Sequence, residues 1–368
     1  MPTPSLLIVP ARFKTGKLYS QIPTSGAGDF TVTRNTAARR FDSAGLVASV
    51  ASGIPRLDYY TSGGVTGCPA LLVEPAATNA LSYSEEFDNA AWGKSAMTVS
   101  TGTTALFTAP DGTTNADKII ATSGNVAHNI NRSGIASAAY TFSVFAKAGE
   151  ESVISLWLRG ASVRAEFNLV SGTVSNITTT SARIENYGNG WYRCTVYDST
   201  AGTTAHVYGR GGAAYAGNGS DGFYLWGAQL ETGSVATSYI PTTTGTVTRN
   251  SDVITNNQFV IPNLIGAILT EFESPTSGTY FVDNLPVTLV SGYNKVAISY
   301  TPTTITVYRN GTQVSGSPFS PPGGVLPILG NVINIGHNNQ YYQLGANIRS
   351  FVLYSSTLTA AEASGLTT

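Results

Sequence analysis

Carboxylate side chains are the first candidates for chemistry in this chain, and they are scarce in its last third. Glu271 and Glu273 form the one pair there whose spacing would suit glycoside hydrolysis, because alternate residues of a strand share a face at about 6.5 Å. A third acid does not follow at Thr276. We therefore expect both carboxylates to lie on a solvated strand, and we predict that the chain is not an enzyme.

The sequence also lacks the residue patterns of other catalytic and metal sites. The three histidines, His128, His206 and His337, are far apart in the sequence and lack metal-ligand spacing. No nucleophile elbow, phosphate-binding loop or dinucleotide fingerprint is present. We expect no cofactor and no metal ion, and we expect Cys68 and Cys194 to be free thiols rather than a disulfide.

Aromatic residues are the remaining carriers of function, because sugar rings stack on them while sugar hydroxyls bond to amides and guanidinium groups. On a strand, Trp157 and Arg159 would share one face, and Tyr208 and Arg210 repeat that pairing. The predicted glycan-binding candidates are Trp157, Arg159, Tyr208, Arg210, Tyr215, Asn338, Tyr341 and Tyr342. Ordinary packing or a contact between subunits is an equally strong interpretation of these residues. The other tryptophans, Trp92, Trp191 and Trp226, are expected in the core.

Composition favours an all-β protein. Of 368 residues, 42% are hydrophobic and only 11% are charged, and helical periodicity is almost absent. No apolar run is long enough to span a membrane. Short apolar and alternating segments separated by turn-forming residues predict strands at Tyr140–Lys147, Ser152–Arg159, Ala165–Leu169, Trp191–Tyr197, Ala205–Gly209 and Gly222–Gln229.

Charge is concentrated at the beginning of the chain. Residues 1–66 hold seven basic and three acidic residues. This excess predicts an attachment segment, with scattered solvated side chains as an equally weighted alternative. The attachment candidates are Arg12, Lys14, Lys17, Arg39 and Arg40. The sequence TVTRN occurs at 31–35 and again at 246–250, each time where a new part of the chain begins.

The last part, residues 251–368, alternates as a sheet protein should. Val296, Ile298 and Tyr300 are expected to point inward, and Asn310-Gly311 predicts a hairpin turn. Thr359, followed by Glu362, predicts a capped helical turn near the end of the chain.

Three segments in the middle of the chain, at 68–95, 186–197 and 221–252, resemble the first, middle and last strands of jelly-roll carbohydrate-binding modules found in bacteriophage fibre and spike proteins. Residues 294–366 resemble laminin-G and concanavalin-A-like lectin domains. The resemblance implies two antiparallel sandwiches, at 67–245 and 251–368, after an N-terminal attachment segment at 1–66. Such modules often hold calcium, for which Asp88 and Glu86 would serve, but the last strand carries no matching carboxylate.

The resemblance implies a non-enzymatic virion protein of a tailed bacteriophage, as a fibre, a spike or a head decoration. Its expected partners are copies of itself, commonly three, other virion proteins through the N-terminal segment, and host-surface polysaccharide. Nucleic-acid binding and membrane insertion are not expected. The expected location is the virion, after assembly in the host cytoplasm. The alternatives are a glycan-binding module of a secreted bacterial glycosidase or adhesin, and a tailspike depolymerase.

Overall fold

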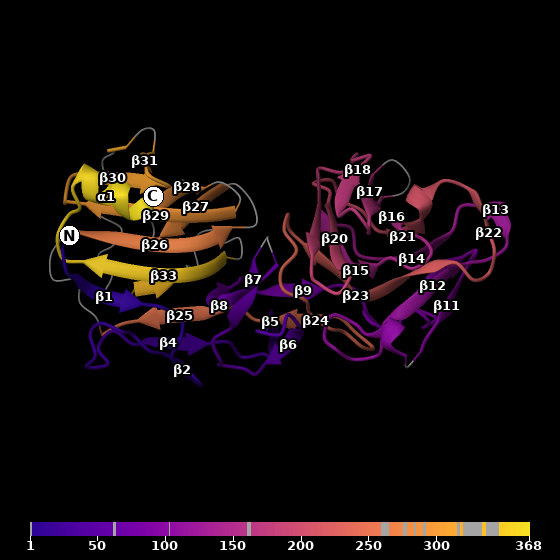
Figure 1. The fold of residues 1–368 in the computed structure, drawn as a ribbon, viewed down its shortest axis with the longest axis horizontal. Helices are drawn as coiled ribbons and strands as arrows, with labels where there is room; N and C mark the ends of the chain where they lie inside the picture. Colours follow the sequence, from indigo (N-terminus) through magenta and orange to yellow (C-terminus); the bar gives the residue numbers. More distant parts are fainter. Residues whose placement is uncertain are drawn as a thin grey trace.

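Two β-sandwiches lie side by side in the computed structural model (Figure 1). The structure describes residues 2–368 except 62–63, 103, 160–162, 259–264, 275–277, 283–284, 290–291, 315–316, 319–332 and 336–345. The predicted all-β class is confirmed, since the strands pair antiparallel and a single α-helix, α1 (Ala360–Thr367), is found in the described residues. No helix in this part of the chain has the length and apolar character needed to cross a membrane.

The middle of the chain folds into one sandwich, here called the module, made of two six-stranded sheets. The first sheet runs β10 (Gly93–Ser95), β14 (Asn129–Arg132), β21 (Ala205–Gly209), β16 (Val153–Leu158), β17 (Arg164–Asn168), β18 (Thr173–Ser175). The second runs β11 (Met97–Ser100), β12 (Asp117–Ala121), β23 (Gly222–Thr232), β15 (Tyr140–Lys147), β20 (Trp191–Tyr197), β19 (Ser181–Asn186).

Alternate apolar side chains of the two sheets meet in the core of the module. Leu156 and Val207 come from the first sheet, and Phe142 and Val196 come from the second. The six strands predicted in this region are confirmed, and three of them have the predicted bounds. Trp92, Trp191 and Trp226 are buried as expected. Cys194 is a buried free thiol, while the side chain of Cys68 lies outside the described residues. The jelly-roll and lectin-like names for the two sandwiches stay predictions.

The second sandwich, here called the body, has an eight-stranded and a five-stranded sheet. The larger sheet runs β31 (Thr312–Gln313), β30 (Ile305–Arg309), β29 (Gly292–Tyr300), β26 (Gly266–Ser274), β33 (Ala346–Tyr354), β8 (Gly64–Val73), β7 (Leu57–Thr61), with β1 (Pro4–Ile8) also paired to β33. The smaller runs β2 (Phe13–Lys14), β3 (Lys17–Leu18), β4 (Phe30–Thr33), β25 (Val253–Asn256), β32 (Ile333–Ile335).

The separate N-terminal segment predicted at 1–66 is not found. Strand β1 pairs antiparallel with β33, with Leu7 opposite Val352, and β4 pairs with β25. Leu6 and Phe30 are completely buried in the core of the body. Short alternating strands near the N-terminus bury their apolar side only when other strands cover it, and here those strands come from the other end of the chain. The body is therefore built from both ends of the sequence.

Local expectations for the last part of the chain are confirmed. Val296, Ile298 and Tyr300 are buried. Asn310 and Gly311 have positive φ angles of 47° and 82°, as a two-residue hairpin turn requires. The Thr359 side chain accepts a hydrogen bond from the Glu362 backbone in a capping box, so α1 begins where the sequence predicts.

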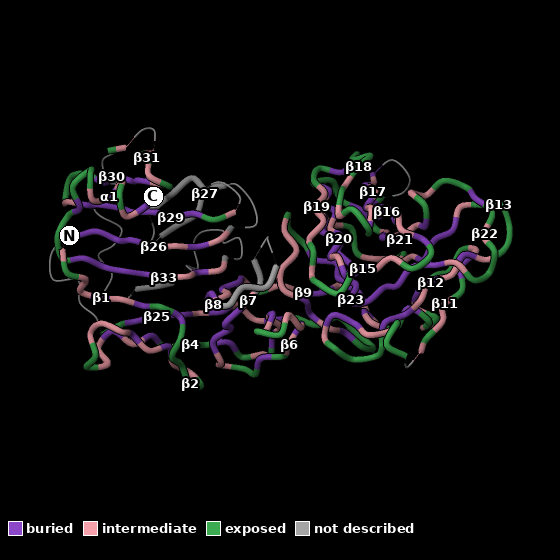
Figure 2. Tube along the Cα trace, viewed as in Figure 1, coloured by how far each residue is buried: buried purple, intermediate pink, exposed green. Residues whose placement is uncertain are grey.

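The module is inserted between the two halves of the body. The chain leaves the body through β9 (Ala77–Asn79) and returns through β24 (Val247–Arg249), and these two strands pair with each other. A hairpin of β5 (Ala38–Phe41) and β6 (Val47–Val50) packs Phe41 and Val47 against the outer side of the module's second sheet. Buried residues follow the central strands of both sandwiches, whereas exposed residues gather in the loops (Figure 2).

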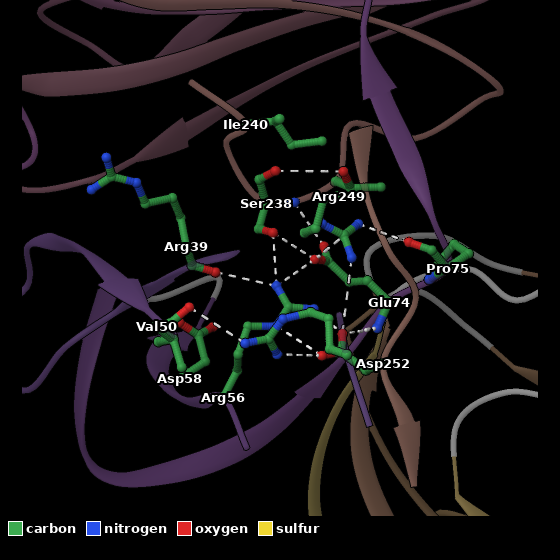
Figure 3. Close-up of polar contacts among 12 residues, drawn as sticks. Arg39, Val50, Arg56, Asp58, Glu74, Pro75, Ser238, Ile240, Arg249 and Asp252 are labelled. Carbon is green, nitrogen blue, oxygen red and sulfur yellow. Dashed lines mark hydrogen bonds and ion pairs between the residues drawn. The ribbon is translucent and has the colours of Figure 1, made fainter. Parts of the chain in front are cut away.

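Five buried charged residues lie at the junction between body and module, and Figure 3 labels four of them, Arg56, Glu74, Arg249 and Asp252. Asp252 accepts from Arg34 at 2.8 Å and also from Arg56, while Glu74 accepts from Arg56 at 2.7 Å and lies 3.4 Å from Arg249. We call these five residues the junction cluster. Arg34 and Arg249 are the arginines of the two TVTRN copies, so the repeated sequence brings both copies to one site.

Neighbouring arginines keep Glu74 ionised in the junction cluster. Burial alone would raise the pKa of Glu74, but Arg249 and Arg56 outweigh burial and lower it to about 2. Each remaining guanidinium is held by carboxylates or backbone carbonyls, and Arg34 donates to the carbonyl of Ala51 at 2.6 Å. Removing one carboxylate would leave a buried positive charge without its partner.

Candidate functional site

The outer side of the module's first sheet carries a surface that we call the polar–aromatic face. Leu156 and Val207 point into the core, so their neighbours along β16 and β21 point outward. In the register of the sheet, Trp157 lies opposite His206 and Ser155 lies opposite Tyr208. The face consists of Asn129, Asn131, Ser155, Trp157, Arg164, Glu166, His206 and Tyr208.

Three aromatic groups form a row across this face. The ring centroids of Trp157 and Tyr208 are 4.0 Å apart with an interplanar angle of 28°, and those of Tyr208 and His206 are 5.7 Å apart at 21°. The guanidinium of Arg164 lies over the Trp157 ring, 5.2 Å from its centroid. One end of the row is therefore covered by Arg164, while no further ring or cation of the described residues contacts His206.

Trp157 is the buried support of this row rather than an exposed sugar platform, which corrects the sequence interpretation. Only 7% of the residue is exposed. Its indole Nε1 donates to the Ser155 hydroxyl at 2.7 Å, and that hydroxyl donates to the carbonyl of Ala165 at 2.9 Å. The half-buried Tyr208 and His206 form the accessible part of the row.

Polar atoms without protein partners accompany these rings. Within the described residues, neither the Tyr208 hydroxyl nor the buried Nδ1 of His206 has a hydrogen-bond partner. Burial lowers the pKa of His206, which favours a neutral imidazole, and burial raises the pKa of Tyr208, which keeps its phenol protonated. Asn131 donates to the side-chain oxygen of Asn129 at 3.0 Å, and its own Oδ1 is free to accept. The face thus offers neutral donors and acceptors beside aromatic carbon, a combination suited to sugars.

Arg210 and Tyr215 form a second cluster at the rim of this face. Arg210 Nε lies 2.6 Å from a carboxylate oxygen of Glu151, and its guanidinium lies 4.4 Å from the Tyr215 ring centroid. Tyr215 is only 9% exposed and packs on His128. The predicted pairing of Tyr208 with Arg210 does not form, because Arg210 has a positive φ of 45° and turns toward Glu151.

Two glycines let this rim lie close to the face. Gly211 and Gly212 have φ angles of +72° and +84°, a region that glycine adopts without strain. A Cβ atom on Gly212 would come within 2.3 Å of the Trp157 ring, and one on Gly211 would come within 2.8 Å of the Glu166 carboxyl carbon. Glycine at 212 therefore lets the rim cover the edge of Trp157, and glycine at 211 leaves room for Glu166.

Arg159 does not share a surface with Trp157, contrary to expectation. A positive φ of 53° at Arg159 ends the regular alternation of β16. The guanidinium instead donates to the carboxylate of Asp198 at 2.8 Å, just after β20 of the opposite sheet. The three lectin-part candidates Asn338, Tyr341 and Tyr342 lie outside the described residues.

Glu271 and Glu273, expected on a solvated strand, are both half-buried and make side-chain contacts within the body. Glu271 accepts a hydrogen bond from the Tyr293 hydroxyl at 2.7 Å, and Glu273 lies 4.0 Å from the guanidinium of Arg349.

The attachment candidates are spread over the body. Arg12 lies over the Tyr19 ring at 5.6 Å, and Lys17 forms an ion pair with Asp29 at 2.9 Å. Lys14 is exposed in the short hairpin of β2 and β3. Arg39 and Arg40 lie on β5, beside the junction.

The acids proposed for calcium surround a third, buried acid. Asp117 accepts a hydrogen bond from the backbone of Phe87 at 2.7 Å. Burial, opposed by that hydrogen bond and reinforced by the charge of Asp88, raises the pKa of Asp117 to about 7. In the described part of the chain, no group of three or more His, Cys, Asp or Glu residues is arranged to hold a metal ion.

Only two of the eight residues of the polar–aromatic face, Trp157 and Tyr208, are predicted from the sequence. From the sequence, His206 is excluded only as a metal ligand, and Asn131 and Arg164 are not indicated. The alternation Asn129-Ile130-Asn131 was the available signal, since it places two amides on the side opposite a buried isoleucine. Their proximity to Tyr208 depends on strand pairing, which alternation alone does not provide.

Comparison with known proteins does not place this chain in a family. No family model and no curated protein matches the chain. One similar solved structure is a Trypanosoma rangeli sialidase in complex with the inhibitor DANA, at 10% identity and a TM-score of 0.24. The match covers 68% of this chain and 60% of the sialidase, so the chain spans less than two thirds of that protein. A likeness at this level carries no argument about activity.

Proposed function

We propose that this chain is a non-enzymatic structural protein of a tailed-bacteriophage virion, a fibre, a spike or a head decoration, that binds host-surface glycans. The polar–aromatic face carries the proposal. There, half-buried Tyr208 and His206 stand beside Asn131, with free neutral hydrogen-bonding atoms and a fixed aromatic support. Neutral amides, a phenol and an imidazole suit the hydroxyls of a sugar better than they suit nucleic acid, which would require a basic surface.

Attachment to the particle is the second half of the proposal. Since residues 4–61 contribute strands to the body, attachment would use the surface of the body rather than a free segment. The exposed side chains of Arg12 and Lys14 lie on this surface and supply positive charge for an acidic partner among the other virion proteins. Self-association, commonly into trimers in the family that the sequence resembles, belongs to the same proposal.

Binding of the purified protein to a panel of bacterial surface polysaccharides tests the glycan proposal. Tyr208→Ala and His206→Ala are each expected to weaken binding by about tenfold or more, equivalent to about 1–3 kcal/mol. Tyr293→Ala is the matched control, because Tyr293 is a 44% exposed tyrosine on the body. Equal loss in the control variant would contradict the assignment to the polar–aromatic face.

The proposal that the protein is not an enzyme is tested separately. Incubation with a bound polysaccharide is expected to release no new reducing ends. Release that disappears in a Glu271→Gln, Glu273→Gln double variant would replace this proposal with a depolymerase.

A further inference from the structure

A pocket of about 340 Å³ opens on the body, on a different sandwich from the polar–aromatic face. Its lining comes from the hairpins β2–β3 and β5–β6 and from the chain that leads into β7. The volume falls within the range of small-ligand sites in proteins. The residues that matter for its chemistry are Phe13, Arg40, Ser49, Ile54, Leu57 and Tyr59.

Arg40 gives the pocket one fixed positive charge. Its Nη1 donates to the backbone carbonyls of Leu57 at 2.8 Å and Phe41 at 3.1 Å, which holds the guanidinium beside a lining residue. In the described residues, no acceptor binds its Nε or Nη2 and no carboxylate lies within 4 Å of it. Two donors of a planar fork are therefore available, the arrangement that a carboxylate accepts.

The neighbouring Arg39 provides a contrast. Successive residues of β5 point to opposite sides, and Arg39 does not line the pocket. In Figure 3 its side chain extends away from the junction cluster, while its backbone carbonyl accepts from Arg56 at 3.2 Å. Arg39 thus carries the same charge at the adjacent position without access to the pocket.

The walls of the pocket suit a ring. Phe13 is 41% exposed at the rim, Tyr59 is half-buried, and Ile54 and Leu57 supply apolar surface. Aromatic rings stack on the C–H face of a sugar, and Ser49 adds a hydroxyl for its hydroxyl groups. No acidic side chain belongs to the lining, so an anionic ligand meets no repulsion there.

We propose that this pocket binds one acidic sugar unit, a uronic acid, with its carboxylate on Arg40 and its ring against Phe13 and Tyr59. The site is independent of the neutral glycan surface on the module. Ligand binding at each of the two sites can therefore be tested separately.

Saturation-transfer NMR and calorimetric titration with D-glucuronate test the proposal, with D-glucose and inorganic phosphate as comparison ligands. Glucuronate is expected to bind at least tenfold more tightly than either comparison ligand. Arg40→Gln should weaken glucuronate binding at least tenfold, whereas Arg39→Gln should leave it unchanged. Phe13→Ala, at an exposed position that tolerates truncation, should weaken binding severalfold even if Arg40→Gln lowers stability.

Three results would overturn the proposal. These are glucuronate binding that survives in both Arg40→Gln and Phe13→Ala, phosphate or glucose binding as tight as that of glucuronate, and the absence of any glucuronate signal in the wild-type protein. Tyr208→Ala is expected to leave glucuronate binding intact, which separates a failure of this site from a failure of the module's face.

Discussion

The module and the body are both sandwiches, yet they depend on the chain in different ways. Every strand of the module's two large sheets comes from residues 93–232, and Leu81 and Phe87, which complete its core, come from the chain just before them. The body joins β1 to β33 and β4 to β25, from opposite ends of the sequence. Closing such long loops costs conformational entropy before any contact offsets it. The comparison teaches that the body's sheets depend on both chain ends, whereas the module's sheets depend on neither, although the β5–β6 hairpin covers part of one of them.

Deleting residues 2–66 should break the body and spare the module. The deletion removes β1, β4 and β7 together with buried Leu6 and Phe30, so the body loses part of both sheets. We expect no cooperative unfolding transition from the body, measured by calorimetry, while hydrogen exchange still shows protected strands in the module. A truncated chain with both transitions intact would show that the N-terminal strands are dispensable.

Asp252→Asn tests how much the junction cluster between the two regions stabilises the protein. The variant leaves Arg34 and Arg56 buried without a shared carboxylate, and loss of one partner of a buried pair costs about 3–5 kcal/mol. Chemical denaturation should show this loss. Glu271→Gln, which changes a half-exposed carboxylate of the body, is the control and should cost less than about 1 kcal/mol. If both variants lose the same free energy of unfolding, the junction cluster does not contribute to stability as proposed.

Trp157→Ala sharpens the distinction between core and surface inside the module. Because Trp157 is buried beneath Arg164 and beside Tyr208, its truncation should cost about 3–5 kcal/mol and lower the melting temperature, as should Trp191→Ala. Tyr208→Ala should cost about 1 kcal/mol less than either, because Tyr208 is only half-buried. A melting temperature unchanged by Trp157→Ala would restore the exposed-platform interpretation.

The pH dependence of the module provides the smallest effect. The pKa of Asp117 is raised to about 7 from an ordinary value of 3.8. The folded state therefore holds a proton that the unfolded state has lost between these two values, so its stability falls as pH rises from about 4 to 7. Asp117→Asn should reduce this fall by about 2 kcal/mol, measured by denaturation at pH 4.5 and 7.5. A difference between wild type and variant that does not change with pH would contradict the assignment.

Sequence patterns predicted the module far better than the body. Tyr140–Lys147 and Trp191–Tyr197 alternate or remain apolar over their whole length, so their existence and bounds follow from the residues themselves. The pairing of Leu7 with Val352 leaves no local mark, because alternation shows which side of a strand is buried and not which strand covers it. For the same reason Trp157 and Tyr208 were found as candidates, whereas Arg164 and Asn131 were not.

The paired strands β9 and β24 have a mechanical consequence. A ligand held on the outer side of β16 and β21 would exert a torque on the module, and a two-stranded ribbon alone would yield as a hinge. Bending there would break the hydrogen bonds of Ser238, which follows β23 of the module, with Glu74 and Arg56, and would separate Phe41 from the module. The junction therefore works as a clamp rather than a pivot, and load on a bound glycan would pass to the body as strain without reorienting the module.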